Sequence, residues 1–411
     1  MDVAVRVTAM AVVVLGLLSG TPGCAAASVD PVDEAAGASS PTSPTTTETT
    51  AAAPPTPVPV GADLYRPPPA LVEGPAGSLV WYQGVFPPVE GARAWRVLYR
   101  SRGDDGDPVL VSGLVVRPTG AAPSGGFPVV SWATGTPGLA DQCAPSKGLA
   151  TVPRLRRLVR EGFVVVASDG EGLGTRGPAH YLIGASEAHG LLDIARAAQS
   201  LPGVAASRRV ALWGYSSGGH GVLAAAERAP AYAPDLRLLG TAAVAPVVDV
   251  ARFVGPVDDH PGFTFLTVGA WGRARGVALA SVFTDRAIAR VPRLRTECAL
   301  TLAFDWPLWR RADLLRFDLR TAEPWRSWLA DELVGVEPVS GPLLVVHGNR
   351  DDIVVPRPTR DLVDRQCAFG TSVDYRRIVG GNHFVAYTTA RQVVDWLVDR
   401  AAARAVVDTC P

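Results

Sequence analysis

A serine near the middle of this 411-residue chain lies in a pattern that suits a nucleophile. The apolar run 210–213 leads into residues 214–219, which read Gly-Tyr-Ser-Ser-Gly-Gly, and an alanine-rich stretch follows. Because Gly-x-Ser-x-Gly between a strand and a helix forces its serine into a sharp turn, the pattern predicts that Ser216 projects from the end of a strand. The hydroxyl of Ser216 is therefore the candidate for attack on a carbonyl carbon.

A serine hydroxyl is a weak nucleophile unless a histidine accepts its proton, and one of the six histidines suits that role. After a strand-turn-helix of this kind the chain order is serine, acid, histidine, and only His383 follows an acid near position 350. His383 lies in the glycine-rich segment 380–384, after an expected strand at 373–379. A lone histidine is more often a surface or packing residue, but order and loop position favour His383 as the general base.

The acid that orients the histidine is expected just after a strand at 343–346, where Asp351 and Asp352 stand side by side. A carboxylate there would hold the imidazole in its useful tautomer and stabilise the imidazolium. The spacing His-Gly-x-x-Asp selects Asp351, whereas the spacing Asp-x-x-Val-Pro selects Asp352. We predict Asp351, because its distance from the strand end determines where the carboxylate lies, and Asp352 is the alternative.

The charge that develops on the carbonyl oxygen needs two backbone N–H donors. One is expected from Ser217, the residue after the nucleophile, where the amides of the following helix also point towards the reacting centre. The second is expected in the loop 133–138, after a strand at 128–132, and Thr136 is the candidate. Pro137 has no N–H and cannot serve.

The elements that would position these residues alternate between strands and helices. An antiparallel pair is expected at 95–99 and 109–117. Further strands are expected at 128–132, 163–168, 210–213, 240–245 and 343–346, with helices at 152–161, 186–199 and 218–228. Because the later strands are apolar on both faces, they are typical of a covered parallel sheet. The chain is predicted to be of the α/β class, with a mostly parallel central sheet flanked by helices.

This alternation stops between about 250 and 340, where no strand pattern is evident and eleven Phe and Trp residues gather. An insertion of this size before the last strands is interpreted as a helical cap. An ordinary helical layer with a well-filled core is the alternative.

The N-terminal region divides by composition. Residues 1–23 hold an apolar run, 7–18, that is too short to cross a hydrocarbon core of about 30 Å, and they are predicted to be a signal peptide. Residues 24–61 are almost entirely Ala, Thr, Pro, Ser and Gly and are predicted to be a disordered tether. Residues 62–411 are predicted to fold. The protein is therefore expected to be exported, with a cytosolic protein as the alternative.

Five cysteines make an odd count for an exported chain. Four of them can pair with one another in three ways: Cys143, Cys298, Cys367 and Cys410. Cys24 follows Gly23 shortly after the apolar run, where bacterial lipoproteins carry their lipidated cysteine. We predict that Cys24 is lipidated and attaches the protein to a membrane. The protein is then expected to be extracellular or a cell-surface lipoprotein. Simple secretion after signal cleavage is the alternative.

Composition also argues against several classes of function. The 39 basic and 39 acidic side chains give a net charge of zero without a basic cluster, so nucleic-acid binding is not expected. No Cys/His set has zinc spacing and no loop has a calcium pattern, so no metal is expected. The segment 170–174 lacks the Gly-x-Gly-x-x-Gly spacing and is expected to be a tight loop. We expect no cofactor and a monomer.

Together, these motifs resemble the secretory lipase family. The resemblance is carried by 128–132, 135–136, 143–146, 169–174, 214–219 and the segment 351–383, and it spans about 62–410. It implies a capped α/β-hydrolase fold that cleaves lipid esters, so a small-molecule acyl ester is the implied substrate. In that family the acid and histidine stand a similar distance apart to Asp351 and His383, which are 32 positions apart here.

The resemblance also implies the disulfides Cys143–Cys298 and Cys367–Cys410. A cysteine like Cys367 follows the acid of the family, which supports Asp351 again. The chain departs from the family at the oxyanion loop, where His-Gly-Thr-Thr-Gly is common and Thr134 and Pro137 replace the first His and the second Thr.

Three kinds of function remain for these residues. The leading hypothesis is a serine ester hydrolase, a triacylglycerol lipase or carboxylesterase, that forms an acyl-enzyme. A serine peptidase or acyltransferase would use the same triad, and a non-catalytic surface binding protein would keep only the fold. If the aromatic cap residues form an apolar wall over Ser216, medium or long acyl chains should be preferred. If those residues pack inward as the core of the cap, short chains should be preferred.

Overall fold

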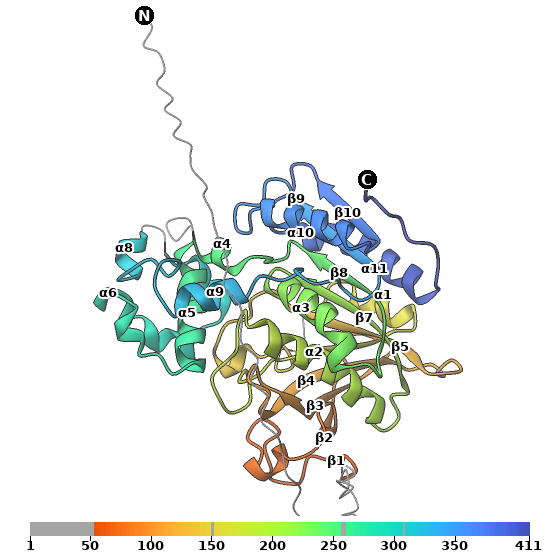
Figure 1. Cartoon of the computed structure of the whole chain (residues 1–411). Coiled ribbons are helices and arrows are strands. Elements are labelled where there is room, and N and C mark those ends of the chain that lie inside the picture. Colours follow the sequence, from red (N-terminus) through yellow and green to blue (C-terminus); the bar gives the residue numbers. More distant parts are fainter. Residues whose placement is uncertain (1–52, 149–151, 256–259, 307–308) are drawn as a thin grey trace, which may run out of the picture. The chain divides into compact units, whose positions relative to one another are not determined.

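The computed structural model describes residues 53–148, 152–255, 260–306 and 309–411 (Figure 1). The chain divides into two units, Met1–Thr49 and Thr50–Pro411, and every described residue belongs to the second. The expected signal peptide, Cys24 and most of the expected tether lie outside the described residues. Within the described ranges, no helix has the length and hydropathy of a membrane span.

One ten-stranded sheet runs through the described part of the chain, in the order β1-β2-β3-β4-β6-β5-β7-β8-β9-β10. The strands are β1 (Thr56–Pro57), β2 (Leu79–Val85), β3 (Ala92–Arg102), β4 (Pro108–Pro118), β5 (Phe127–Ala133), β6 (Val164–Ser168), β7 (Ala206–Tyr215), β8 (Arg237–Val244), β9 (Leu343–Gly348) and β10 (Val373–Ile378). The pairs from β2 to β6 are antiparallel, and the pairs from β6 to β10 are parallel. The predicted α/β class and mostly parallel sheet are confirmed.

Helices cover both faces of this sheet (Figure 1). On one face lie α2 (Gly184–Ser200), α3 (Ser217–Tyr232) and α10 (Arg357–Ala368), and on the other lie α1 (Leu155–Arg160) and α11 (Val385–Ala401). The central strands are mostly apolar for this reason, and every position of β9 is buried. The loops at the carboxyl ends of the parallel strands share one edge of the sheet, where α/β proteins place their ligand sites.

Between β8 and β9, the described residues form a helical insertion. It consists of α4 (Val250–Val254), α5 (Pro261–Ala274), α6 (Asp285–Ile288), α7 (Ala299–Phe304), α8 (Arg311–Leu314) and α9 (Trp325–Asp331), with 3-10 turns at Leu279–Ser281 and Val291–Arg295. Two further 3-10 turns lie outside it, at Pro69–Val72 and Asp141–Cys143. The region expected at about 250–340 is therefore helical, and it is called the cap below.

The described aromatic side chains of the cap pack mostly against one another. Phe265, Trp271 and Phe283 are fully buried, and the ring of Phe265 lies 5.1 Å from that of Phe283 and 4.9 Å from that of Trp306. They belong to a cluster of buried side chains that is separate from the two clusters flanking the sheet. The expectation of an aromatic wall is wrong, because short helices that fold beside the sheet need these side chains for a core of their own.

Two disulfides form in the pairing that the family resemblance implies. Cys143–Cys298 joins the segment after β5 to the start of α7, and Cys367–Cys410 joins α10 to the C-terminal segment. Beside the first bridge, the N–H of Ala299 donates to the carbonyl oxygen of Pro137 at 3.0 Å. The cap is thus fastened to the loop 133–138.

The sheet begins earlier in the chain than the composition of residues 24–61 predicts. Residues Thr56 and Pro57 pair with Trp81 and Tyr82 of β2, and the N–H of Val58 donates to the carbonyl oxygen of Tyr82 at 3.0 Å. The prediction that the tether extends to residue 61 is therefore wrong at this end. An edge strand requires only backbone groups, so its side chains carried no signal.

Candidate active site

Ser216 occupies the turn between β7 and α3, with φ of 56° and ψ of −119°. Positive φ is uncommon for a residue with a side chain, and it marks the strained turn that the motif predicts. A Cβ on Gly214 would lie 2.1 Å from the carbonyl oxygen of Gly218, and a Cβ on Gly218 would lie 2.2 Å from that of Ala133. Only glycine therefore fits two positions before Ser216 and two positions after it.

Ser216, His383 and Asp351 form one hydrogen-bonded line. In the loop between β10 and α11, His383 has its Nε2 2.9 Å from Ser216 Oγ and its Nδ1 2.8 Å from Asp351 Oδ2. Asp351 follows the carboxyl end of β9. An ionised carboxylate only accepts, so Nδ1 carries the proton and Nε2 is left to accept from the hydroxyl of Ser216. All three residues are buried.

Asp351 accepts hydrogen bonds from three other groups in addition to His383. Its Oδ1 accepts from the N–H of Ile353 at 3.0 Å and of Val354 at 2.8 Å, and its Oδ2 accepts from His347 Nε2 at 3.1 Å. Burial raises the pKa of Asp351, but hydrogen bonds from His347 and His383 outweigh it and lower this pKa to about 2. The carboxylate is therefore ionised at neutral pH and held in one orientation.

The alternative acid, Asp352, is exposed. Its backbone oxygen accepts from His260 Nε2 at 2.9 Å, and none of its hydrogen bonds within the described ranges goes to His383. The geometry therefore favours Asp351. His347 is a site residue that was not predicted, although the spacing motif that selects Asp351 begins at this histidine.

The two predicted oxyanion donors lie together beside Ser216. Ser217 begins α3, and the Oγ1 of Thr136 lies 3.4 Å from the Oγ of Ser217. Neither backbone N–H donates to another described residue, so both are free to bind a substrate oxygen. The Oγ1 of Thr136 also lies 2.8 Å from the hydroxyl of Tyr181. No motif marks Tyr181, which comes from the loop between β6 and α2.

A cavity of about 430 Å³ opens onto Ser216 and His383. The cap contributes Phe263 and Leu300 to its lining, and Phe263 is the only one of the eleven aromatic cap residues among the described lining residues. No Asp, Glu, Lys or Arg side chain lines the described part of the cavity. A neutral and mostly apolar lining suits an uncharged, apolar ligand.

Comparison with known proteins bears on the chemistry of this site. A family model described as "Secretory lipase" matches residues 150–409. Lipase 2 of Candida albicans is 23% identical over 389 residues, which cover 85% of this chain and 82% of that protein. A protein of Mycobacterium tuberculosis described as a probable inactive lipase is 24% identical over 351 residues, 80% of this chain and 77% of that protein.

Solved structures show the same fold. Candida antarctica lipase A matches with a TM-score of 0.75 at 20% sequence identity, over 86% of this chain and 88% of that one. LipA of Xanthomonas oryzae, a rice cell wall degrading esterase, matches with a TM-score of 0.66 at 21% identity, over 78% of this chain and 99% of that one. At these identities the matches establish the α/β-hydrolase fold.

Proposed function

Because the chain belongs to the secretory lipase family and is an ester-hydrolysing enzyme, we propose that it cleaves acyl esters through an acyl-enzyme on Ser216. His383 is the proposed general base and then acid, and Asp351 is the proposed orienting carboxylate. The observation that carries this assignment is the hydrogen-bonded line from Ser216 through His383 to Asp351, beside an apolar cavity.

Acylation begins when Ser216 Oγ bonds to the ester carbonyl carbon while His383 Nε2 takes the hydroxyl proton. The proposed donors to the oxyanion are the N–H groups of Ser217 and Thr136. The tetrahedral intermediate then collapses, the bond to the alcohol oxygen breaks, and His383 returns its proton to that oxygen. Asp351, which is already ionised, stabilises the imidazolium in between.

Deacylation repeats these steps with water as the nucleophile. His383 takes a proton from the water as its oxygen bonds to the acyl carbon, and the second tetrahedral intermediate expels Ser216 Oγ. His383 protonates the departing serine oxygen, which releases the carboxylic acid and regenerates the enzyme.

A small-molecule acyl ester is the substrate class that the neutral lining supports. Triacylglycerol lipases and carboxylesterases both act on substrates of this class. A serine peptidase or acyltransferase would use the same triad, and the relative described as inactive makes a non-catalytic protein the further alternative. The complete line of Ser216, His383 and Asp351 supports an active enzyme.

The deciding experiment treats the purified protein with a fluorophosphonate probe and measures hydrolysis of p-nitrophenyl esters and of peptide amides. We expect labelling, rapid ester hydrolysis and slow amide hydrolysis, and Ser216→Ala should abolish both labelling and turnover. Efficient amide cleavage would indicate a peptidase, and acyl transfer to an added alcohol in preference to water would indicate a transferase. A correctly folded protein without labelling would make it a binding protein.

Export agrees with the secretory family and with the apolar N-terminal run. We propose further that residues 1–23 are a signal peptide, that Cys24 carries lipid, and that the following segment tethers a monomeric enzyme to a membrane. The disulfides support the role of Cys24, because they use the other four cysteines.

A further inference from the structure

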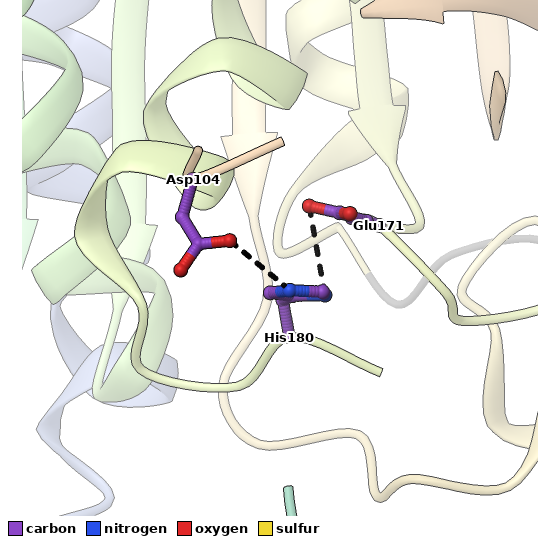
Figure 2. Close-up of side chains that lie close together, drawn as sticks. All are labelled: Asp104, Glu171 and His180. Atoms are coloured by element: carbon purple, nitrogen blue, oxygen red, sulfur yellow. Dashed lines mark ion pairs between the residues drawn. The ribbon is translucent and has the colours of Figure 1, made fainter. Parts of the chain in front are cut away.

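A second group of polar side chains lies outside the proposed triad (Figure 2). Asp104 lies in the turn between β3 and β4, and Glu171 and His180 lie in the loop between β6 and α2. One ligand atom from each side chain, a carboxylate oxygen or an imidazole nitrogen, lies within 4.8 Å of the other two. Because these residues are far apart in the sequence, no spacing motif could reveal the group.

The imidazole of His180 is oriented by its own loop. Its Nδ1 lies 3.1 Å from the carbonyl oxygen of Pro178, and a carbonyl only accepts, so Nδ1 carries a proton. In the neutral ring, Nε2 then presents a lone pair to Asp104 Oδ1, which is 3.3 Å away. Two facing lone pairs repel each other, so this geometry requires a cation between them, either a proton or a metal ion.

The surroundings of His180 are rich in carboxylates. The Oε2 of Glu171 lies 3.5 Å from His180 Nδ1. Burial, together with the nearby charges of Asp104 and Asp105, raises the pKa of Glu171. One cap residue, Arg275, has its Nη2 3.8 Å from Asp104 Oδ2. Asp104 and Glu171 thus face the imidazole, and Arg275 is shared with Glu332, whose Oε1 also lies 3.8 Å from its Nη2, so the group has room for additional positive charge.

We propose that Asp104, Glu171 and His180 bind a divalent transition-metal cation, with Zn²⁺ the best match to one nitrogen and two carboxylate oxygens. Tetrahedral zinc with bonds of about 2.1 Å holds neighbouring ligand atoms about 3.4 Å apart. The observed distance from Nε2 to Asp104 Oδ1, 3.3 Å, agrees with this separation. Glu171 offers a carboxylate oxygen within 4.8 Å of the ligand atoms of Asp104 and His180, and it would supply the second carboxylate.

Neighbouring residues hydrogen-bond to two of these side chains, as they commonly do to side chains that bind a metal. The carbonyl oxygen of Pro178 accepts from the ring nitrogen of His180 that does not face Asp104, and Ser186 Oγ donates to Glu171 Oε2 at 2.6 Å. Ligating histidines and carboxylates commonly have such partners, which fix the tautomer and the orientation of the ligand.

The proposed cation would fasten the turn between β3 and β4 to the loop that carries Tyr181. Tyr181 directly follows His180, and its hydroxyl contacts Thr136 of the proposed oxyanion loop. The role is therefore structural, since the ion would hold this loop in place and take no part in making or breaking the ester bond. The proposal stands whichever ester the enzyme cleaves.

A protonated His180 without metal is the competing explanation, and it has the opposite dependence on pH. Burial lowers the pKa of His180, but Asp104 and Glu171 outweigh it and raise this pKa. An imidazolium would therefore stabilise the fold below the ordinary histidine pKa, and that stabilisation would be lost as the pH rises through the raised value. Zinc replaces the proton, so its binding strengthens as the pH rises.

The test uses the full exported chain without a histidine tag. The protein is stripped with a chelator, and its melting temperature and calorimetric binding are measured with Zn²⁺, and separately with Ca²⁺, below and above a pH of about 6.5. The variants are Asp104→Asn, Glu171→Gln and His180→Gln. His260→Gln, a half-buried histidine at the start of α5, and Glu90→Gln, an exposed carboxylate, are the controls.

We expect one Zn²⁺ per chain and a higher melting temperature with zinc in the wild type and both controls, most clearly at the higher pH. Each ligand variant should bind zinc at least about tenfold more weakly. A zinc response in His180→Gln equal to that of the wild type would overturn the proposal, as would a wild type that prefers Ca²⁺ or ignores both ions. If His180→Gln does not fold, the exposed Asp104→Asn provides the comparison.

Discussion

At the scale of single residues, the carboxylate of Asp351 must stay ionised and must keep one orientation towards His383. Its Oδ2 accepts from His383 and His347, while its Oδ1 accepts from the N–H groups of Ile353 and Val354. A carboxylate surrounded by donors stays ionised and cannot rotate away from the imidazole. A carboxylate near His383 without these donors would be less readily ionised when buried, and its orientation would not be fixed.

Asparagine at the two neighbouring aspartates tests this difference. Asp351→Asn should lower kcat by about 10⁴-fold, because the amide favours the wrong tautomer of His383. Asp352→Asn should change kcat by less than about threefold, since this residue is exposed. Steady-state hydrolysis of a p-nitrophenyl ester measures both, and Ser216→Ala provides the background rate. If the two effects came out reversed, the acid would be Asp352 and the rest of the triad would stand.

Acid should weaken the fold partly through Asp351. Its pKa of about 2 lies below the ordinary aspartate value of about 3.9, so the unfolded chain binds this proton first as the pH falls. The corresponding stabilisation, about 2–3 kcal/mol, is complete above about pH 5 and is lost progressively as the pH falls through about 2. Urea unfolding of the wild type and Asp351→Asn should therefore give free energies that converge across this window. A constant difference would show that Asp351 binds no proton there.

How far a residue could be predicted depends on how local its signal is. Ser216 and His383 could be identified because glycine spacing and chain order are properties of short segments. His347 contacts Thr359 Oγ1 at 2.8 Å as well as Asp351, and Tyr181 contacts Thr136. The contact of Tyr181 with Thr136 joins segments that only folding brings together, and the spacing His-Gly-x-x-Asp gives the position of His347 but not its hydrogen bonds, so the sequence alone shows neither contact.

At the scale of elements, the loop between β6 and α2 links the cap to the proposed oxyanion loop. The Trp271 Nε1–H of α5 donates to the carbonyl oxygen of Tyr181 at 2.9 Å, and the hydroxyl of Tyr181 meets Thr136 Oγ1 at 2.8 Å. Tyr181 is buried, so this support is shielded from water. The position of Thr136 therefore depends on a residue that has no role in the chemistry itself.

Removing the hydroxyl of Tyr181 tests that dependence. Tyr181→Phe should lower kcat by about tenfold and leave KM nearly unchanged, because the oxyanion contact strengthens in the transition state. Tyr375→Phe is the matched control, since the Tyr375 hydroxyl is buried and has no hydrogen-bond partner within the described residues. Steady-state kinetics on one ester separate the two parameters. A change in KM alone would assign Tyr181 to substrate binding instead.

The predicted and missed elements differ in what holds them in place. The parallel strands were predictable because burial on both faces leaves continuous apolar runs, as in β9. β1 and the antiparallel β2 were both missed, and for the two-residue edge strand β1 the reason is that backbone pairing leaves little pattern in the side chains. The aromatic content of the cap predicted its existence, but composition cannot show which way the rings face.

At the scale of the whole molecule, the pairing of the cysteines bears on how the enzyme is anchored. With Cys143–Cys298 and Cys367–Cys410 formed, Cys24 is the one remaining cysteine of the chain. Metabolic labelling with a fatty-acid analogue should mark the wild type and leave Cys24→Ala unmarked, and only the wild type should fractionate with membranes. A wild type that is unlabelled and found in the medium would show ordinary secretion.

The acyl preference follows from how the cap meets the site. Its described aromatic rings lie in one buried cluster or pack against it, and the described part of the cavity wall that the cap supplies consists of Phe263 and the aliphatic side chains of Ala299, Leu300 and Ala303. The bridge Cys143–Cys298 joins this wall to the segment after β5, and Cys143 itself lines the cavity. The described part of this wall is therefore apolar, but it comes from only four side chains.

A cavity of about 430 Å³ with this lining should reward added methylenes only until it is filled. Each methylene taken fully out of water contributes about 0.8 kcal/mol, so kcat/KM should rise by at most about fourfold per methylene from acetate to medium chains. Beyond the medium chains, kcat/KM should level off, because further carbons stay in water. Esterase assays over a p-nitrophenyl ester series measure the profile. Leu300→Trp should move the plateau to shorter chains, and a flat wild-type profile from acetate onward would show that the acyl chain lies outside this cavity.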